Sequence, residues 1–240
     1  MSKEMKKIQT ICIDTVNQIQ NKQYMGMLDK KTMVSRDKWR DFGVELFMLM
    51  EQLKERGFEN VLVLGREGTG KSYGLKYLEP GTNIWFNSDN KNATFRNIEF
   101  GGEKIRPVDV YGDKSKPTKF MTVPEDYGSI INYVDDIKKG GLLADKPVAF
   151  IMGHIQDFKG ANDETREKFK TLGSLATKMN IEGSVEYCLY SHIVVNGDNV
   201  EYKLDTSNSG FNTARSSEEA FPTRYIDNNF HTIYDAIINY

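Results

Sequence analysis

Residues 60–72 read N-V-L-V-L-G-R-E-G-T-G-K-S, and this stretch decides the fold. Residues 60–64 are apolar on both faces, which is typical of a strand inside a parallel sheet. Residues 65–72 match G-x-x-x-x-G-K-[ST], a loop that cradles phosphate when a strand precedes it and a helix follows. A short helix is expected next, ending before Pro80. The stretch therefore predicts an α/β protein with a phosphate-binding loop at the carboxyl end of one strand.

The chemistry of such a loop needs these residue types at this spacing. Its glycines permit backbone angles that turn successive N–H groups toward phosphate oxygens. Lys71 brings a cation to the β- and γ-phosphates, and the Ser72 hydroxyl can bind Mg²⁺. We therefore expect ATP and Mg²⁺ as ligands; the alternative is a glycine-rich turn that merely joins strand to helix. The predicted nucleotide-binding residues are Gly65, Arg66, Glu67, Gly68, Thr69, Gly70, Lys71, Ser72 and Tyr73.

A magnesium site also needs a carboxylate, and two predicted strand ends offer one. Asp14 closes the apolar run 10–13 and is predicted to hold the metal's water shell together with Ser72. The alternative role for Asp14 is to cap a following helix. Asp89 follows the predicted strand 83–86 and is a catalytic candidate that orients or deprotonates the attacking water. An exposed turn residue is the simpler interpretation of Asp89.

His154 follows a further predicted strand, residues 148–152, which is expected to end at Gly153-His154. A polar side chain at that place can sense the γ-phosphate. A hydrogen-bonded structural histidine is the equally weighted alternative. His192 and His231 fit no ligand spacing with cysteine or carboxylate, so the pattern does not support a zinc site.

The rest of the chain alternates strands and helices. Apolar residues every three or four positions predict helices near 36–56, 127–137, 169–179 and 233–237. The stretch after Asp14 is polar, and residues 97–124 read as a long loop. From Gly183 the pattern changes to period two, and Asn196-Gly197 is a strong turn signal, so residues 185–204 predict a β-hairpin. This order predicts an α/β core with a C-terminal β-hairpin appendage.

Composition excludes several classes of protein. The chain has 240 residues and 39% hydrophobic side chains, enough for a core and too many for general disorder. The net charge of −2 shows no overall basic excess of the kind typical of nucleic-acid-binding proteins. No apolar run approaches the ~20 residues that span a bilayer, and no signal peptide is recognisable. Cys12 and Cys188 lie in apolar runs and are expected to be buried thiols, so we predict a cytoplasmic protein without a membrane partner.

Several of these segments resemble the phage-encoded RecA-like P-loop ATPases, including the single-strand-annealing type. The phosphate loop is common to all P-loop proteins, so other segments carry the resemblance. Residues 86–95 resemble the family's segment after its second strand, and residues 13–15 resemble its Walker B strand. Residues 150–154 resemble its sensor strand, and residues 178–183 resemble the segment before its β-hairpin. The C-terminal end is similar at 213–216 and 226–228.

The order of these segments departs from the family, because the Walker B segment comes first. The chain reads as one domain, 1–240, with an Asp14 strand and helix (1–56), a phosphate-loop unit (57–140), a sensor strand and helix (141–182) and a hairpin with a terminal helix (183–240). Each unit begins with a strand and ends with a helix, so exchanging units reroutes connections only at the edge away from the loop. We therefore expect the same sheet and the same site.

The resemblance implies a three-layer RecA-like P-loop NTPase core with a mostly parallel sheet. It implies Mg²⁺-dependent ATP hydrolysis in phage recombination or replication, in the cytoplasm of an infected bacterium. The implied partners are single-stranded DNA, a single-strand binding protein and further copies of the chain. In such assemblies a neighbour supplies a cation to the γ-phosphate, and Arg215 is the candidate. Lysines and arginines between 104 and 119 are candidates for DNA contacts, although a solvated loop is the simpler interpretation.

Two other functions share the phosphate loop. A nucleotide or small-molecule kinase would need a basic lid, for which the segment 158–170 is the candidate. A nucleotide-dependent binding module with weak hydrolysis is the second alternative. It stays open because Thr15, which follows Asp14, cannot act as a base.

Overall fold

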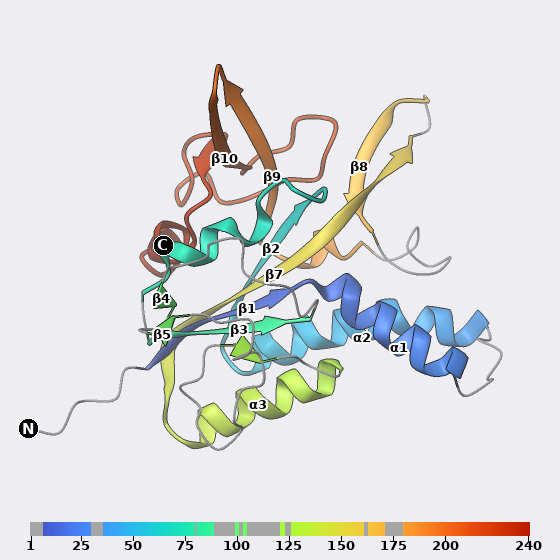
Figure 1. Ribbon diagram of the computed structural model, residues 1–240, viewed down its shortest axis with the longest axis vertical. Helices are drawn as coiled ribbons and strands as arrows, with labels where there is room; N and C mark the ends of the chain where they lie inside the picture. The colour runs from blue at the N-terminus through green and yellow to red at the C-terminus, as the bar shows by residue number, and fades with distance from the viewer. Residues whose placement is uncertain are drawn as a thin grey trace, which may run out of the picture.

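The computed structural model has an α/β fold built around one mixed, mostly parallel sheet (Figure 1). It describes residues 7–29, 36–79, 81–88, 99–100, 103–104, 121–122, 126–160, 163–170 and 180–240. In these ranges the main sheet has nine strands, in the order β11-β10-β9-β2-β7-β1-β3-β6, with β8 paired to β7 alone. No helix within them combines the length and the apolar character needed to cross a bilayer.

The elements follow one another along the chain, and the described segment 206–224 connects β10 to β11. The strands of the main sheet are β1 (Ile8–Asp14), β2 (Glu59–Gly65), β3 (Asn83–Asn87), β6 (Met121–Thr122), β7 (Leu143–Lys159), β8 (Thr165–Phe169), β9 (Tyr187–Asn196), β10 (Asn199–Asp205) and β11 (Tyr225–Asp227). A separate pair is formed by β4 (Glu99–Phe100) and β5 (Glu103–Lys104). The helices are α1 (Val16–Asp29), α2 (Arg36–Glu55), α3 (Tyr127–Lys139) and α4 (Phe230–Ile238), with 3₁₀ turns η1 (Lys71–Tyr77) and η3 (Glu182–Ser184).

Both faces of the sheet are apolar and both are covered. Successive residues of β1 point to opposite faces, so Ile11 and Ile13 join one buried cluster and Cys12 joins the other. Helices α1, α2 and α3 lie together on the first side (Figure 1). Helix α4 and the turn η1 cover the second side, where Phe230 stacks on Phe150 of β7 with ring centroids 4.3 Å apart. As predicted, Cys12 and Cys188 are buried free thiols, and burial raises the pKa of both.

The C-terminal hairpin is part of the main sheet, so the prediction of an appendage is wrong. Residues 187–190 of β9 pair in parallel with β2, and the hairpin with β10 continues the sheet from there. The hairpin itself is confirmed, with its turn at Gly197 in the left-handed region (φ 62°). Because β9 borders the phosphate-loop strand, the hairpin stands directly beside the loop.

The strand bearing His154 does not end there, which corrects a second prediction. β7 runs on to Lys159, turns at Gly160 and returns as β8 in an antiparallel pair. We call residues 155–169 of this pair the β7–β8 arm; Figure 1 shows it extending beyond the body of the sheet. Phe169, predicted to begin a helix, ends β8, and residues 171–179 lie outside the described part. The basic segment considered as a kinase lid is therefore largely this arm.

Helix α1 was not predicted from the sequence, because the stretch after Asp14 is mostly polar. Only Val16 and Ile19 give this helix a fully buried apolar anchor in its first turns. Helix α2 was predicted almost to the residue, and Gly57 (φ 96°) ends it as expected. A long loop was predicted at 97–124. In this range the structure describes only the two-residue strands β4, β5 and β6.

An ion pair joins the N-terminal segment to the helix that precedes β7. Arg56, after α2, donates from Nε and Nη2 to the two carboxylate oxygens of Asp135 on α3, at 2.8 and 2.9 Å. This hydrogen bonding lowers the pKa of Asp135. The Lys138 ammonium also donates to the Arg56 carbonyl at 3.2 Å. The carboxyl end of α2 is thus tied to α3 by directed bonds as well as by apolar packing.

Replacing Phe230 by Ala should destabilise the protein strongly. Phe230 has no solvent-exposed surface, so the variant loses the stacked ring and leaves a cavity, which costs about 3–5 kcal/mol of unfolding free energy. Phe211, which is 66% exposed, provides the matched control, and Phe211→Ala should change stability by less than about 0.5 kcal/mol. Urea denaturation monitored by circular dichroism measures both. Equal losses in the two variants would contradict the packing described for α4.

Candidate functional site

The loop after β2 forms a tight turn held by the C-terminal strands. Gly68 and Gly70 adopt left-handed backbone angles, with φ 77° and 82°. The ring of Tyr202 from β10 packs so closely on Gly70 that a Cβ there would approach it to 2.2 Å. The side chain of Asn228 donates to the Gly70 carbonyl at 2.6 Å. Glycine at position 70 is therefore required both by its conformation and by its neighbour.

Lys71 is buried and reaches back into its own loop. Its ammonium group donates to the carbonyl oxygens of Gly65 and Arg66, at 3.1 and 2.8 Å. The same nitrogen lies 3.3 Å from Nδ1 of His154. A cation is thus held at the centre of the loop, beside the one histidine that the sequence analysis placed there. The helix predicted after Lys71 is present as the 3₁₀ turn η1.

Asp14 and Ser72 meet although 58 residues separate them. The Ser72 hydroxyl donates a hydrogen bond to Oδ2 of Asp14, the last residue of β1. Asp14 ends β1, and Ser72 follows the loop at the end of β2. Because β1 and β2 both run parallel to β7, their carboxyl ends lie at the same edge of the sheet. The Asp14 backbone carbonyl in turn accepts from the Ser88 amide at 2.6 Å, and the Asp14–Thr15 peptide bond is cis. The pair offers one hydroxyl and one carboxylate oxygen, the donor types that Mg²⁺ prefers.

His154 is positioned by strand pairing and by α1. In the register of β7 against β2, His154 lies opposite Gly65, the first residue of the loop. Its backbone amide donates to Oδ1 of Asn17 at 2.7 Å, and the Asn17 amide group donates to the Lys170 carbonyl. Asn17 was not among the predicted residues, because it lies in the helix that the sequence analysis missed. The structure therefore brings His154, Lys71 and the loop together.

The outer residues of the loop have partners on other elements. The Thr69 hydroxyl hydrogen-bonds with the Ser191 hydroxyl of β9 at 2.6 Å and donates to the Arg66 carbonyl at 2.8 Å. The Arg66 guanidinium donates to Asp157 and Glu167 of the β7–β8 arm. Glu67 is exposed. Ser191, Asp157 and Glu167 carry no motif, so only the folded chain identifies them.

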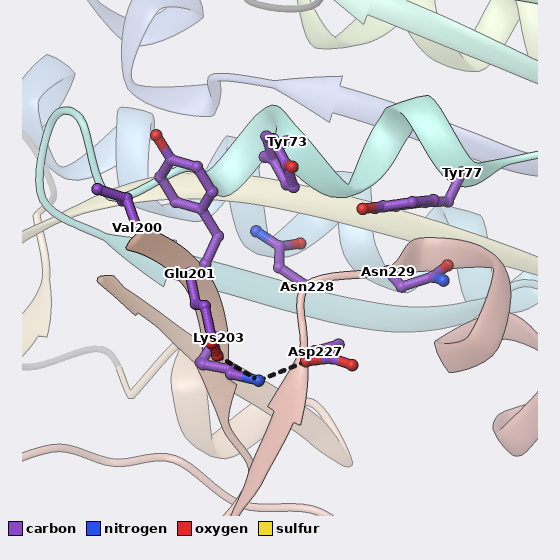
Figure 2. Close-up of a pocket in the computed structure, with 9 residues that line it drawn as sticks. Tyr73, Tyr77, Val200, Glu201, Lys203, Asp227, Asn228 and Asn229 are labelled. Carbon is purple, nitrogen blue, oxygen red and sulfur yellow. Dashed lines mark hydrogen bonds and ion pairs between the residues drawn. The ribbon is translucent and has the colours of Figure 1, made fainter. Parts of the chain in front are cut away.

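A polar groove of about 420 Å³ begins one residue after Ser72 (Figure 2). Tyr73 and Tyr77 of η1 form one wall, and residues of β10 and the turn after β11 form the other. One face of Tyr73 lies against Tyr202, with ring centroids 4.5 Å apart, and Lys76 lies 3.5 Å from its ring centroid. A hydrogen bond with Lys76 lowers the pKa of Tyr73. The other lining residues are Val200, Glu201, Lys203, Asp227, Asn228 and Asn229.

Of the other two predicted catalytic residues, one lies outside the described part of the chain and one lies away from the loop. Asp89 lies outside the described residues, as do the side chains between 104 and 119. Arg215 pairs with Cys188 of β9, and its guanidinium donates to the carbonyls of Gly183, at 3.0 Å, and Val185. Those carbonyls precede β9, at the sheet edge away from the loop. A role for Arg215 toward a neighbouring copy stays a prediction.

The remaining histidines have structural neighbours. His192 packs edge-on against Tyr225, with ring centroids 5.1 Å apart, and His231 lies 3.5 Å from Asp235 on α4. Within the described side chains, no three residues of the types His, Cys, Asp and Glu gather as a metal-binding group.

Comparison of the chain with protein-family models, with curated proteins and with solved structures found no match. The resemblance to phage RecA-like ATPases thus rests on the sequence segments described above, and it stays a prediction.

Replacing Gly70 by Ala should destabilise the protein more than the same change at Gly68. Both positions require a left-handed backbone, which costs an L-residue about 1–2 kcal/mol. Only the methyl group at position 70 would also strike the Tyr202 ring, since nothing lies within 4 Å of a Cβ at Gly68. Removing that ring in the double variant Gly70→Ala, Tyr202→Ala should recover part of the loss. Urea midpoints test the order, and identical midpoints for the two single variants would refute it.

Proposed function

We propose that the chain binds and hydrolyses a nucleoside triphosphate with Mg²⁺, and that ATP is the substrate. The observation that carries the proposal is the hydrogen bond from the Ser72 hydroxyl to the Asp14 carboxylate. A phosphate-loop sequence alone can be a turn. A strand-terminal carboxylate brought to its serine, with a buried lysine one residue away, is the donor set that magnesium-bound triphosphate requires.

The protein's own groups suggest how the site would act. Lys71 would exchange the carbonyls of Gly65 and Arg66 for the oxygens of the β- and γ-phosphates, so its charge is held in place before the substrate arrives. The loop amides would surround the phosphates in the concavity that Gly68 and Gly70 create. When bound by Ser72 and the water shell at Asp14, magnesium would neutralise the phosphate charge.

His154 is proposed as the residue that detects the terminal phosphate. Its Nδ1 lies 3.3 Å from the Lys71 ammonium, and its backbone is fixed by strand pairing and by Asn17. When Lys71 turns to the phosphates, the imidazole loses this neighbour and can donate to the γ-phosphate. A change at the loop would then be transmitted along β7 into the β7–β8 arm.

The polar groove beside Ser72 is proposed to hold the nucleoside. It adjoins the phosphate loop through Tyr73, and charged and polar residues of β10 and β11 line its other wall (Figure 2). Tyr77 is 43% exposed and presents ring surface to this space. The groove also contains both signs of charge, which suits a neutral base and sugar better than a further phosphate.

The RecA-like core and a role in phage recombination or replication are proposed from the sequence resemblance to phage RecA-like ATPases. The position of β7 between β2 and β1, with helices on both faces, supports a RecA-like core despite the altered chain order. Action on single-stranded DNA, partnership with a single-strand binding protein and assembly of copies rest on the sequence resemblance alone. A nucleotide-dependent binding module is the second candidate, because Thr15 follows Asp14 where a basic carboxylate would favour rapid hydrolysis.

Replacing Lys71 by Ala, or Asp14 by Asn, should lower ATP turnover by about 100-fold or more, because each removes charge that stabilises phosphoryl transfer. Turnover is measured by phosphate release with and without single-stranded DNA. Lys146→Ala is the matched control: this exposed lysine belongs to the opposite end of β7 and contacts Ile238. Stimulation by DNA would support the recombination ATPase, whereas tight ATP binding without turnover would favour the binding module. Absence of ATP binding by the unmodified chain would refute the proposal.

Replacing Tyr77 by Ala should weaken ATP binding about tenfold, because ring contact with a base contributes about 1–3 kcal/mol. The affinity for inorganic tripolyphosphate should stay unchanged, since that ligand has no nucleoside. Tyr225→Ala is the control, because Tyr225 is 50% exposed and lies outside the groove. Calorimetric titration with both ligands makes the comparison. An equal loss for both ligands would show that Tyr77 acts on the phosphate loop and not on a nucleoside.

A further inference from the structure

The β7–β8 arm carries two carboxylates that face each other. In its antiparallel register Asp157 lies directly opposite Glu167, and like charges at such a pair repel. Both side chains are partly exposed. The arm therefore contains a local electrostatic cost that a cation between the two strands would relieve.

Arg66 of the phosphate loop supplies that cation. Its Nη2 donates to Asp157 at 2.5 Å and to Glu167 at 3.0 Å, and its Nε donates to Glu167 at 3.2 Å. These partners are 91 and 101 residues away along the chain. The guanidinium is planar and always charged, so it can bridge two carboxylates in one fixed arrangement.

The backbone of Arg66 also contacts the site itself. Its carbonyl accepts from the Lys71 ammonium at 2.8 Å and from the Thr69 hydroxyl at 2.8 Å. Arg66 thus contacts the arm with its side chain and the Lys71 ammonium with its carbonyl. Displacement of the Arg66 side chain would move the group that positions Lys71.

The base of the arm is anchored to the rest of the protein. The Lys170 amide donates to the His154 carbonyl at 2.7 Å, and the Glu167 amide donates to the Phe211 carbonyl at 2.6 Å. These bonds hold β8 against the end of β7 and against the segment that follows β10. The carboxylates that bind Arg66 therefore lie on a hairpin that is itself hydrogen-bonded to the body of the protein.

We propose that Asp157 and Glu167 are positioning residues for the phosphate loop, acting through Arg66 to hold the loop and Lys71 ready for a triphosphate. The inference rests on the proposed function and adds to it a part of the chain that contacts no phosphate. A loop ordered in advance loses less conformational freedom on binding, so its ligand binds more tightly. The carboxylates thus raise affinity for the phosphate chain, whatever nucleoside is attached.

The test compares three variants: Arg66→Ala, the double variant Asp157→Asn, Glu167→Gln, and the combination of all three changes. Each should bind Mg²⁺-ATP and inorganic tripolyphosphate about two- to fivefold more weakly, the scale expected for exposed ion pairs. The combined variant should be no weaker than the others, because all three remove the same interaction. Arg66→Lys, which keeps the charge and loses the bridging geometry, should recover part of the affinity.

The arm provides its own control. Arg166 is exposed and pairs with Glu164 of the same arm at 2.9 Å, so Arg166→Ala should leave both affinities unchanged. Thermal unfolding of every variant separates positioning from loss of folding. Additive losses in the combined variant, equal losses in Arg166→Ala, or weaker binding of ATP alone would overturn the inference. If the unmodified chain binds neither ligand, the proposed function fails, and this inference fails with it.

Discussion

The edge where β1 and β2 end, on either side of His154 in β7, is the constraint on which the site depends. Parallel pairing aligns Gly65 with His154, and it brings the end of β1 close enough for Asp14 to accept the Ser72 hydroxyl. Antiparallel neighbours would send these ends to opposite edges. Both faces of the sheet are covered by apolar packing, so the strands are held where this alignment requires them.

Around that edge the loop contacts β9, β10, the β7–β8 arm and the turn after β11. Asn228 and Tyr202 hold Gly70, Ser191 holds Thr69, and the β7–β8 arm holds Arg66. The lysine at the centre is satisfied by loop carbonyls. Such a loop is ordered before any ligand arrives, and binding would exchange hydrogen bonds instead of creating order from a flexible segment.

Local patterns predicted most of the elements, and the errors share one physical cause. The apolar runs ending at Asp14 and Gly65 were predicted as strands because their side chains must be buried. The hairpin turn at Gly197 was predicted because its backbone needs glycine. The partner of β9 was missed, since period-two alternation indicates a strand but not its neighbour. The extension of β7 and the helix α1 were missed because exposed or polar residues carry a weak periodic signal.

Residue type and spacing alone were enough to predict the glycine-rich loop at 65–72, the strands that end at Asp14 and Gly65, and the candidate roles of Lys71, Ser72 and Asp14. Only the tertiary structure decided which distant groups meet them. The partners of the loop lie 58 residues away at Asp14, 91 at Asp157, 122 at Ser191 and 158 at Asn228. Contacts over such separations depend on strand order and register, which are set by the packing of the whole sheet and not by any local run of residues.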